Sequence, residues 1–267
     1  MKLRKAYSYY NEHDPYAAKW LENLIKKGLI SDGVVDTRSI EDVIPEDLEH
    51  FNQCHFFAGI GVWSYALRKA GVSDDENVWT GSCPCQPFSS TGQRKGLKDE
   101  RHLWPTFFNL IRSCKPKRVM GEQVASKDGL AWLDLVYTDL EDADYSVRAV
   151  DTCAAGFGAP NIRQRLYWVA DSNSSQFKRN ELQSRVDSKD TRSRDDSSYK
   201  LQREGPDSFW KDPDWICGQD QKWRSIEPGT FPLAHGVAQR VGQLRAYGNA
   251  LNAEQAIGFI EAIYETT

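Results

Sequence analysis

The sequence lacks the features of membrane and secreted proteins. It has no apolar run long enough to span a bilayer, and no apolar signal core follows the basic residues 1–5. We therefore expect a cytoplasmic protein with no membrane partner. An internal repeat is also missing. With 40% hydrophobic and 27% charged residues, the 267-residue chain can form one sizeable core and a small second domain.

The cysteines do not follow a disulfide or zinc-binding pattern. Six cysteines are scattered along the chain without a secretory context. Cys83 and Cys85 form a C-x-C pair, which is not the usual spacing of a zinc site. We expect a reduced chain with no metal and with at least one reactive thiol.

The chain also lacks the overall positive charge of a simple nucleic-acid binder, since its net charge is −4. The charge is uneven: residues 31–50 hold seven acids and one base, whereas bases are frequent in residues 178–203. An acidic enzyme can still present a local basic face to nucleic acid. The ordinary alternative is that both runs are solvated surface.

Residues 1–170 alternate between strand-like and helix-like segments. Strands are expected at 6–10, 54–58, 78–82, 118–124, 146–153 and 165–170, and helices at 14–27, 63–69, 103–114 and 129–140. This alternation predicts an α/β fold with a doubly wound, mostly parallel sheet. Residues 171–239 are polar and form a small separate region, and 240–267 return to the main domain with a helix capped by Asn252.

Two motifs lie where strands are expected to end. Residues 57–61 read Phe-Ala-Gly-Ile-Gly, and glycines before a helix let a ligand approach the backbone, although such turns also serve geometry alone. Residues 81–89 follow another strand and present Cys85 between a proline and a glutamine. A buried, inert thiol is the commoner fate of a free cysteine, and Cys83 fits that description.

Four further motifs carry polar side chains. Residues 91–96 hold two glycines and two bases, typical of a loop that closes over DNA or of an ordinary surface loop. Glu122 ends an apolar strand, and residues 160–165 place two arginines on one side of an extended chain. The fourth, residues 247–250, reads Tyr-Gly-Asn-Ala and directly precedes the final helix. Each is modest alone, because carboxylates and arginines at strand ends are often only solvated.

Together these motifs resemble the DNA cytosine-5 methyltransferase family, and within it the compact phage and prophage enzymes. The resemblance covers most of 1–170 and again 240–267. It implies a Rossmann-like domain that binds S-adenosylmethionine, with a small inserted target-recognition region. The implied catalytic residues are Cys85, Gln86, Glu122, Arg163 and Arg165. The implied cofactor residues are Asn11, Glu12, His13, Asp36, Phe57, Ala58, Gly59, Ile60, Gly61, Pro84, Asn249 and Ala250.

The chain departs from the family pattern in four ways. Gln123 replaces the usual asparagine, Asn161 the usual glutamine, and His13 the aromatic residue that stacks on adenine. The largest departure is order, because Glu12 and Asp36 precede the glycine loop, whereas their counterparts follow it in most of the family. The resemblance implies that Glu12 holds the ribose hydroxyls and that Asp36 reads the adenine amino group. The cofactor half is thus expected to be permuted.

The resemblance implies methyl transfer to C5 of a flipped-out cytosine in double-stranded DNA, through a covalent adduct between Cys85 and C6. A monomer in a bacterial cell or phage-infected host is expected, serving genome protection or restriction-modification. Residues assigned to DNA are Ser89, Thr91, Arg94, Lys95 and Arg224. The alternatives are an RNA cytosine-5 methyltransferase and a catalytically silent DNA-binding relative. A nicotinamide oxidoreductase is disfavoured, because residues 57–61 supply only G-x-G.

Overall fold

A computed structural model describes residues 8–84, 103–159, 162–172 and 250–266, together with the backbone of 214–217 and 223–226. The chain divides into two compact units, Met1–Ser172 with Phe231–Thr267, and Asn173–Thr230. In the second unit, β8 (Asp214–Cys217) pairs antiparallel with β9 (Trp223–Ile226). In the described chain, no helix is both long and apolar enough to cross a bilayer.

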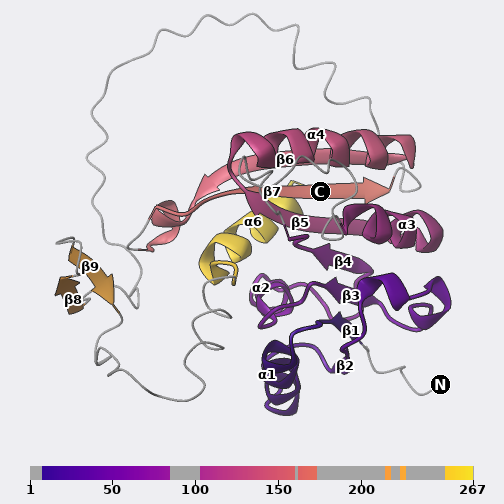
Figure 1. The fold of residues 1–267 in the computed structure, drawn as a ribbon, viewed down its shortest axis with the longest axis horizontal. Helices are drawn as coiled ribbons and strands as arrows, with labels where there is room; N and C mark the ends of the chain where they lie inside the picture. Colours follow the sequence, from indigo (N-terminus) through magenta and orange to yellow (C-terminus); the bar gives the residue numbers. More distant parts are fainter. Residues whose placement is uncertain are drawn as a thin grey trace, which may run out of the picture. The chain divides into compact units, whose positions relative to one another are not determined.

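The first unit is built on a seven-stranded sheet with the order β2-β1-β3-β4-β5-β7-β6 (Figure 1). Its strands are β1 (Ser8–Asn11), β2 (Gly33–Asp36), β3 (Gln53–Phe56), β4 (Val78–Gly81), β5 (Arg118–Val124), β6 (Tyr145–Cys153) and β7 (Gln164–Ser172). The first five strands run parallel, whereas β7 is antiparallel to both β5 and β6. The expectation of a doubly wound, mostly parallel sheet is confirmed.

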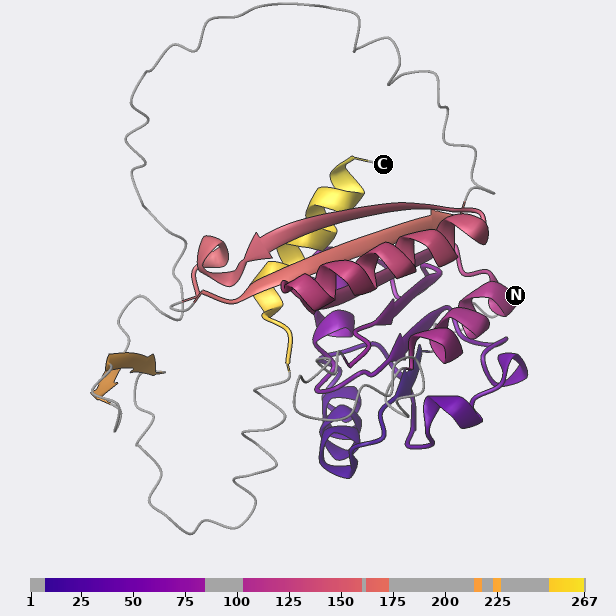
Figure 2. The ribbon, with the colours of Figure 1, turned by 45° about the horizontal axis from the view of Figure 1, so that its top comes forward.

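Helices cover both faces of this sheet (Figure 2). They are α1 (Pro15–Lys26), α2 (Val62–Lys69), α3 (Trp104–Cys114), α4 (Lys127–Asp142) and α6 (Ala253–Glu265), with short 3₁₀ turns η1 (Ile40–Asp42), η2 (Pro45–Asp47) and η4 (Ala154–Phe157). Helices α1, α2 and α6 lie on one face. Helices α3 and α4 lie on the other, with η1 and η2. A sheet buried on both faces explains why its strands read as nearly continuous apolar runs.

Helices α1, α4 and α6 each begin at a side chain that caps the first turn. Asp14 accepts hydrogen bonds from the backbone N–H groups of Tyr16 and Ala17, and Pro15 occupies the first helical position of α1. Ser126 caps α4 through the N–H of Gly129. Asn252 caps α6 through the N–H of Gln255, as its sequence predicted. These caps satisfy donors that the first turn would otherwise leave unpaired.

Most element boundaries differ from the sequence-based expectation by one or two residues, and two of these differences affect turns next to the site. The strand expected at 54–58 ends at Phe56, because Phe57 adopts a φ of 51° and turns the chain out of the sheet. Helix α4 starts at Lys127 rather than at residue 129, since Ser126 supplies the cap two residues earlier than expected. The first difference lengthens the connection between β3 and α2, and the second shortens the connection between β5 and α4.

The core is divided by the sheet. On one side, aromatic rings of α3, α4 and β7 pack together around Trp104, whose centroid lies 5.6 Å from that of Trp132 and 6.0 Å from that of Trp168. On the other side, α2 and α6 meet over Met120 and Tyr167. The two layers hold the strands rigidly, so side chains at the strand ends are positioned by packed elements.

Candidate active site

The carboxyl ends of all five parallel strands lie along one edge of the sheet, and the predicted functional residues follow them there. β1 leads to Glu12, β2 ends in Asp36, and β3 leads into the glycine loop 57–61. β4 leads into residues 82–84, and Glu122 lies near the end of β5. This is the edge at which open α/β sheets bind ligands.

Glu12 ties the end of β1 to the glycine loop. One of its carboxylate oxygens accepts a hydrogen bond from the N–H of Gly59 at 2.7 Å, and the other accepts one from the N–H of Asp14 at 2.8 Å. Gly59 has a φ of 55°, and only a carbonyl oxygen 4.0 Å away borders the place where a Cβ would stand. The loop therefore has a glycine where the backbone requires one and open space above it.

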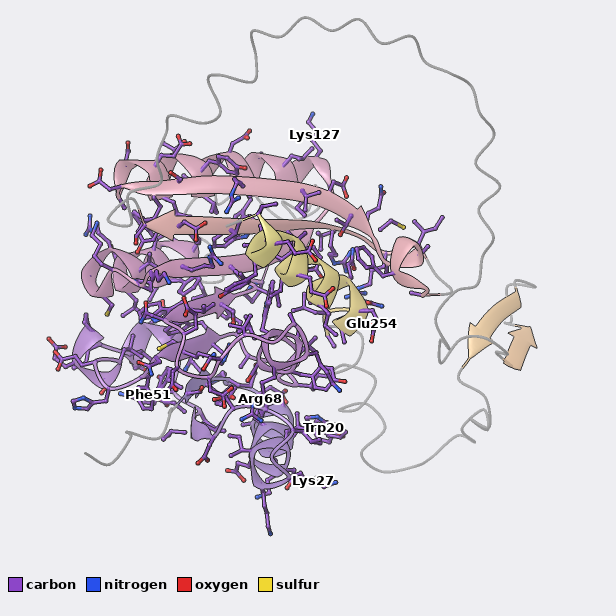
Figure 3. The ribbon with its side chains drawn as sticks, turned by 180° about the vertical axis from the view of Figure 1, so that it is seen from behind. Trp20, Lys27, Phe51, Arg68, Lys127 and Glu254 are labelled. Atoms are coloured by element: carbon purple, nitrogen blue, oxygen red, sulfur yellow. The ribbon has the colours of Figure 1, made fainter. Side chains whose placement is uncertain are left out.

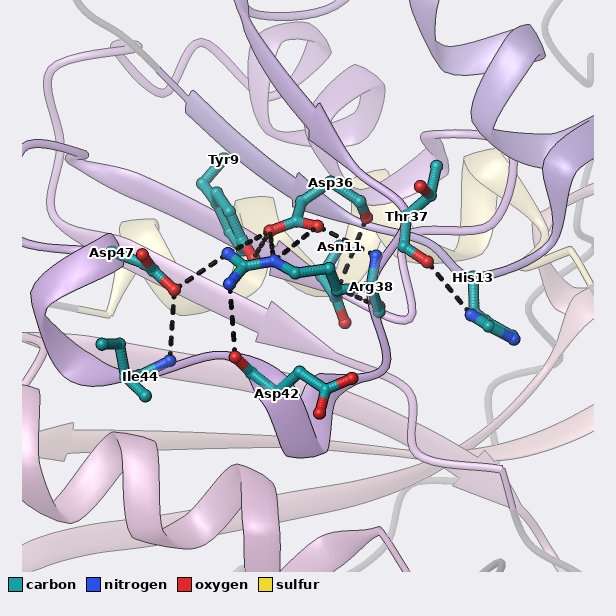
Figure 4. A network of polar contacts seen from close by, with 9 residues as sticks. All are labelled: Tyr9, Asn11, His13, Asp36, Thr37, Arg38, Asp42, Ile44 and Asp47. Atoms are coloured by element: carbon teal, nitrogen blue, oxygen red, sulfur yellow. Dashed lines mark hydrogen bonds and ion pairs between the residues drawn. The ribbon is translucent and has the colours of Figure 1, made fainter.

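Asp36 lies at the centre of a polar network beside this loop (Figure 4). Its carboxylate accepts hydrogen bonds from the Tyr9 hydroxyl at 2.8 Å and from the Arg38 guanidinium at 2.7 Å. Arg38 also contacts the Asp47 carboxylate at 2.8 Å. Burial opposes ionisation of Asp36, but the hydrogen bonds from Arg38 and Tyr9 hold its pKa below the usual value. Asp36 is thus an ionised and fully engaged carboxylate.

His13 lies next to the same turn. Its Nδ1 is 3.0 Å from the carbonyl oxygen of Thr37, and the Nδ2 of Asn11 donates to the carbonyl oxygen of Arg38 at 3.0 Å (Figure 4). The predicted cofactor residues that follow β1 and β2 are therefore brought together by hydrogen bonds from side chains to the main chain as well as by strand pairing.

Glu122 and Arg165 form an ion pair at the adjoining end of β5 and β7. The Glu122 carboxylate lies 2.6 Å from the Arg165 Nε, with only 12% of the Glu122 side chain exposed. The antiparallel register places Arg165 opposite Val124, two residues from Glu122 on the same face of the sheet. Burial raises the pKa of Glu122, and Arg165 and Arg163 offset part of that rise. A partly compensated, buried carboxyl group can hold and release a proton.

Arg163 is held by the C-terminal part of the chain. Its guanidinium donates to the carbonyl oxygen of Ala250 at 3.0 Å, just before α6. Inside α6, Gln255 donates to the Thr152 hydroxyl of β6 at 2.6 Å. Figure 3 shows Lys127 at the start of α4 and Glu254 in the first turn of α6. The C-terminal segment is thereby joined to Arg163 and to β6.

The segment before Cys85 is held from both sides. The Trp63 indole donates to the Ser82 hydroxyl at 3.1 Å, and the Gln123 amide donates to the Cys83 carbonyl oxygen at 3.3 Å. Cys83 itself is buried, and burial raises the pKa of its thiol well above the usual range. That environment is typical of an inert structural cysteine.

Several predicted site residues lie outside the described residues: Cys85, Gln86, Ser89, Thr91, Arg94, Lys95 and Asn249, and the side chain of Arg224. Conversely, sequence reasoning did not select Tyr9, Arg38 or Trp63, although all three contact predicted residues or the chain next to Cys85. A tyrosine or tryptophan in an apolar element reads as core material, so only the polar atom's partner identifies its role.

Comparison with known proteins matches much of this chain to one family. Residues 67–223 match the family described as C-5 cytosine-specific DNA methylase, and this span begins after the glycine loop. The type II methyltransferase M.HhaI of Haemophilus parahaemolyticus is 34% identical over 103 residues, 37% of this chain and 32% of that protein. M1.ScrFI of Lactococcus lactis subsp. cremoris is 28% identical over 152 residues, 54% of this chain and 39% of that protein.

The aligned regions thus span about a third of the length of these curated relatives. Among solved structures, the S. pombe Dnmt2 methyltransferase superposes with a TM-score of 0.38 and 17% identity, covering 63% of this chain and 51% of that one. A superposition this weak supports no conclusion about function. The family match itself covers more than half of the 267 residues. The chain belongs to the C-5 cytosine-specific DNA methylase family.

Proposed function

We propose that the protein methylates C5 of a flipped-out cytosine in double-stranded DNA, with Cys85 as the nucleophile and S-adenosylmethionine as the donor. The observation that carries the proposal is the buried Glu122–Arg165 pair, 2.6 Å apart, at the same sheet edge as the segment that leads to Cys85. A carboxyl group with a raised pKa suits a group that protonates N3 of the base.

The residues at the ends of β1, β2 and β3 fit the proposed cofactor. Open space above Gly59 accommodates a ligand against the backbone, and each Glu12 oxygen keeps a lone pair for a ribose hydroxyl. Asp36, His13 and Asn11, which come together at the ends of β1 and β2, are proposed to border the adenine of the cofactor. When bound there, S-adenosylmethionine supplies an electrophilic methyl group.

The proposed chemistry begins at Cys85. Its thiolate adds to C6 of cytosine, which makes C5 nucleophilic while N3 takes a proton from Glu122. Arg165 orients the Glu122 carboxyl group, and Arg163, held by the Ala250 carbonyl, binds the base oxygen O2. After methylation, water takes the C5 proton, the bond between sulfur and C6 breaks to restore the thiolate, and N3 returns its proton to Glu122. Gln86 next to the nucleophile is proposed to support it.

The proposed substrate interface comes from the residues that follow Cys85 in the sequence and from the recognition region. Ser89, Thr91, Arg94 and Lys95 are proposed to follow the DNA backbone, and Arg224 to belong to the recognition region, with the protein acting as a monomer. Methylation of RNA by the same chemistry, and a silent relative that only binds DNA, remain the competing functions. An RNA methyltransferase would form the covalent adduct with RNA, and a silent relative would form no adduct.

The test is mass spectrometry of the protein after incubation with S-adenosylmethionine and duplex DNA containing 5-fluorocytosine. Fluorine at C5 blocks the final elimination, so the enzyme should be trapped as an adduct on Cys85, with none in Cys85→Ser. Cys83→Ser is the matched control and should still be trapped, because Cys83 is buried. An adduct only with RNA would favour the RNA enzyme. No adduct with either polymer in a panel of sequences would contradict the proposal.

A further inference from the structure

Two buried side chains from different elements form hydrogen bonds with Ser82 and Cys83, consecutive residues of the segment that leads to Cys85. Trp63 of α2 binds the side chain of Ser82, and Gln123 of β5 binds the main chain of Cys83. The two hydrogen-bond donors lie on opposite faces of the sheet, since Trp63 packs in the α2–α6 layer and Gln123 lies on the α3–α4 side. Residues 82 and 83 are therefore restrained in more than one direction.

Trp63 is itself immobilised. Only 4% of it is exposed, and its ring packs edge-on against Tyr167 at 5.8 Å and Phe259 at 6.4 Å between centroids. A ring fixed in this way aims its N–H in one direction, at the Ser82 hydroxyl. Because Trp63 follows Gly61 by two residues, the same first turn of α2 connects the glycine loop to the segment before Cys85.

Gln123 is equally constrained. It is 2% exposed, and while its Nε2 donates to the Cys83 carbonyl, its Oε1 accepts from the N–H of Val124 at 2.9 Å. Both ends of the amide are committed, so the side chain cannot rotate without breaking a buried hydrogen bond. The neighbouring residue is Glu122, so the strand that carries the proton donor also holds the segment before the nucleophile.

We propose that Trp63 and Gln123 are positioning residues that set where Cys85 enters the site, relative to the glycine loop and to Glu122. The inference rests on the proposed function, in which Cys85 attacks C6. Only Pro84, with its restricted φ, separates Cys83 from Cys85, so a displacement at residues 82–83 passes directly to the nucleophile. Displacements of about 1 Å at a reacting atom can cost about a hundredfold in rate.

A double-mutant cycle tests the Trp63–Ser82 bond. Trp63→Phe keeps a ring in the core but removes the donor, and Ser82→Ala removes the acceptor. The readout is the single-turnover rate of adduct formation with 5-fluorocytosine DNA. We expect each variant to slow this rate about tenfold, and the double variant to be no slower than the slower single variant. Ser82→Thr keeps an acceptor oxygen, so its rate of adduct formation should match that of the wild-type protein.

Gln123→Met provides a second, independent arm, because it keeps the volume but loses both hydrogen bonds. Two further readouts accompany each variant: affinity for S-adenosylhomocysteine, which should stay within about twofold, and melting temperature. Tyr145→Phe is the matched control, since it removes a buried hydrogen bond of 2.8 Å to the Pro116 carbonyl far from this segment. It should lower stability and leave the adduct rate unchanged.

Three results would overturn the inference. Wild-type adduct rates in Trp63→Phe and Gln123→Met, with lowered melting temperatures, would make both contacts structural only. A parallel loss of S-adenosylhomocysteine affinity would place their effect on the cofactor pocket. An absence of adduct in the wild-type protein would instead contradict the proposed function, and the inference with it.

Discussion

At the scale of single residues, the least expected finding is that Asp36 has no uncommitted carboxylate oxygen. One oxygen accepts from the Arg38 main-chain N–H at 2.9 Å and from the Arg38 Nε at 3.2 Å, and the other accepts from the Tyr9 hydroxyl and the Arg38 guanidinium. An aspartate that reads the adenine amino group needs a lone pair directed at the ligand. The engaged carboxylate favours a role in holding the turn 36–38, which borders the pocket.

Asp36→Asn distinguishes these roles. If Asp36 holds the turn, loss of its charge should weaken binding of S-adenosylhomocysteine and of its inosine analogue by the same factor, about tenfold. Calorimetric titration of both ligands measures this. Glu22→Gln, which breaks the exposed ion pair between Lys19 and Glu22, should change neither affinity. If the wild-type protein prefers the adenine ligand and the variant does not, the Asp36 carboxylate reads the amino group.

At the scale of elements, the strand–helix–strand crossovers that connect the parallel strands do not all have the same handedness. The β1–α1–β2 crossover steps toward the β2 edge, with α1 on the face of Tyr10 and His55. The β3–α2–β4 crossover steps the other way over the same face, so its hand is opposite. The β4–α3–β5 crossover also steps that way but over the other face, and it shares the hand of the first.

Nearly all such crossovers in proteins have one hand, so the β3–α2–β4 connection is the exception. A connection from α2 to β1 would step toward the β2 edge over the same face and would have the common hand. We infer that the chain order is permuted, with the glycine-loop strand moved behind β1 and β2 while each element keeps its place in the sheet. Such a rearrangement preserves the site, because the site depends on spatial position.

Packing between elements depends on Gly121 of β5. A Cβ at this position would lie 2.3 Å from the ring of Trp168 and 2.6 Å from the main-chain oxygen of Gly81. We expect Gly121→Ala to lower the free energy of unfolding by more than about 2 kcal/mol, measured by urea denaturation. Gly156→Ala, where a Cβ would meet nothing within 4 Å, should change it by less than about 0.5 kcal/mol. Equal effects at both positions would contradict this account.

At the scale of the whole molecule, the first unit contains a buried histidine whose protonation is opposed by burial. His55 is 1% exposed, stacks on Tyr10, and its Nδ1 is 2.8 Å from the Thr80 hydroxyl. Burial lowers its pKa from 6.5 to about 3. Between these two values the unfolded chain binds a proton that the folded chain does not, so the stability of the fold falls as the pH falls.

Stability should therefore decrease below about pH 6.5, and His55 alone should account for about 2 kcal/mol between pH 7 and pH 5. Urea unfolding at a series of pH values measures the slope. His55→Phe, which keeps a ring against Tyr10, should flatten the slope in this range even if it lowers the absolute stability. An unchanged slope in His55→Phe would assign the pH dependence to other groups.

The sequence by itself determined the local features of this protein. Periodicity located the strands and helices, glycines located the turn at 57–61, and an asparagine located the start of α6. It also indicated the family, because Glu122, Arg163 and Arg165 are recognisable from their neighbours along the chain. In the structure, the Arg165 Nε lies 2.6 Å from the Glu122 carboxylate.

Only the tertiary structure decided which groups meet across the sheet. The strand order places β3 between β1 and β4 and includes the exceptional β3–α2–β4 crossover. The hydrogen bonds from Trp63 to Ser82 and from Gln123 to Cys83 likewise join residues far apart in sequence. Turns and helix ends depend on interactions over a few residues, so a short stretch of sequence is enough to predict them. Strand pairing and the partner of a buried polar atom are long-range choices, set by how all the layers pack together.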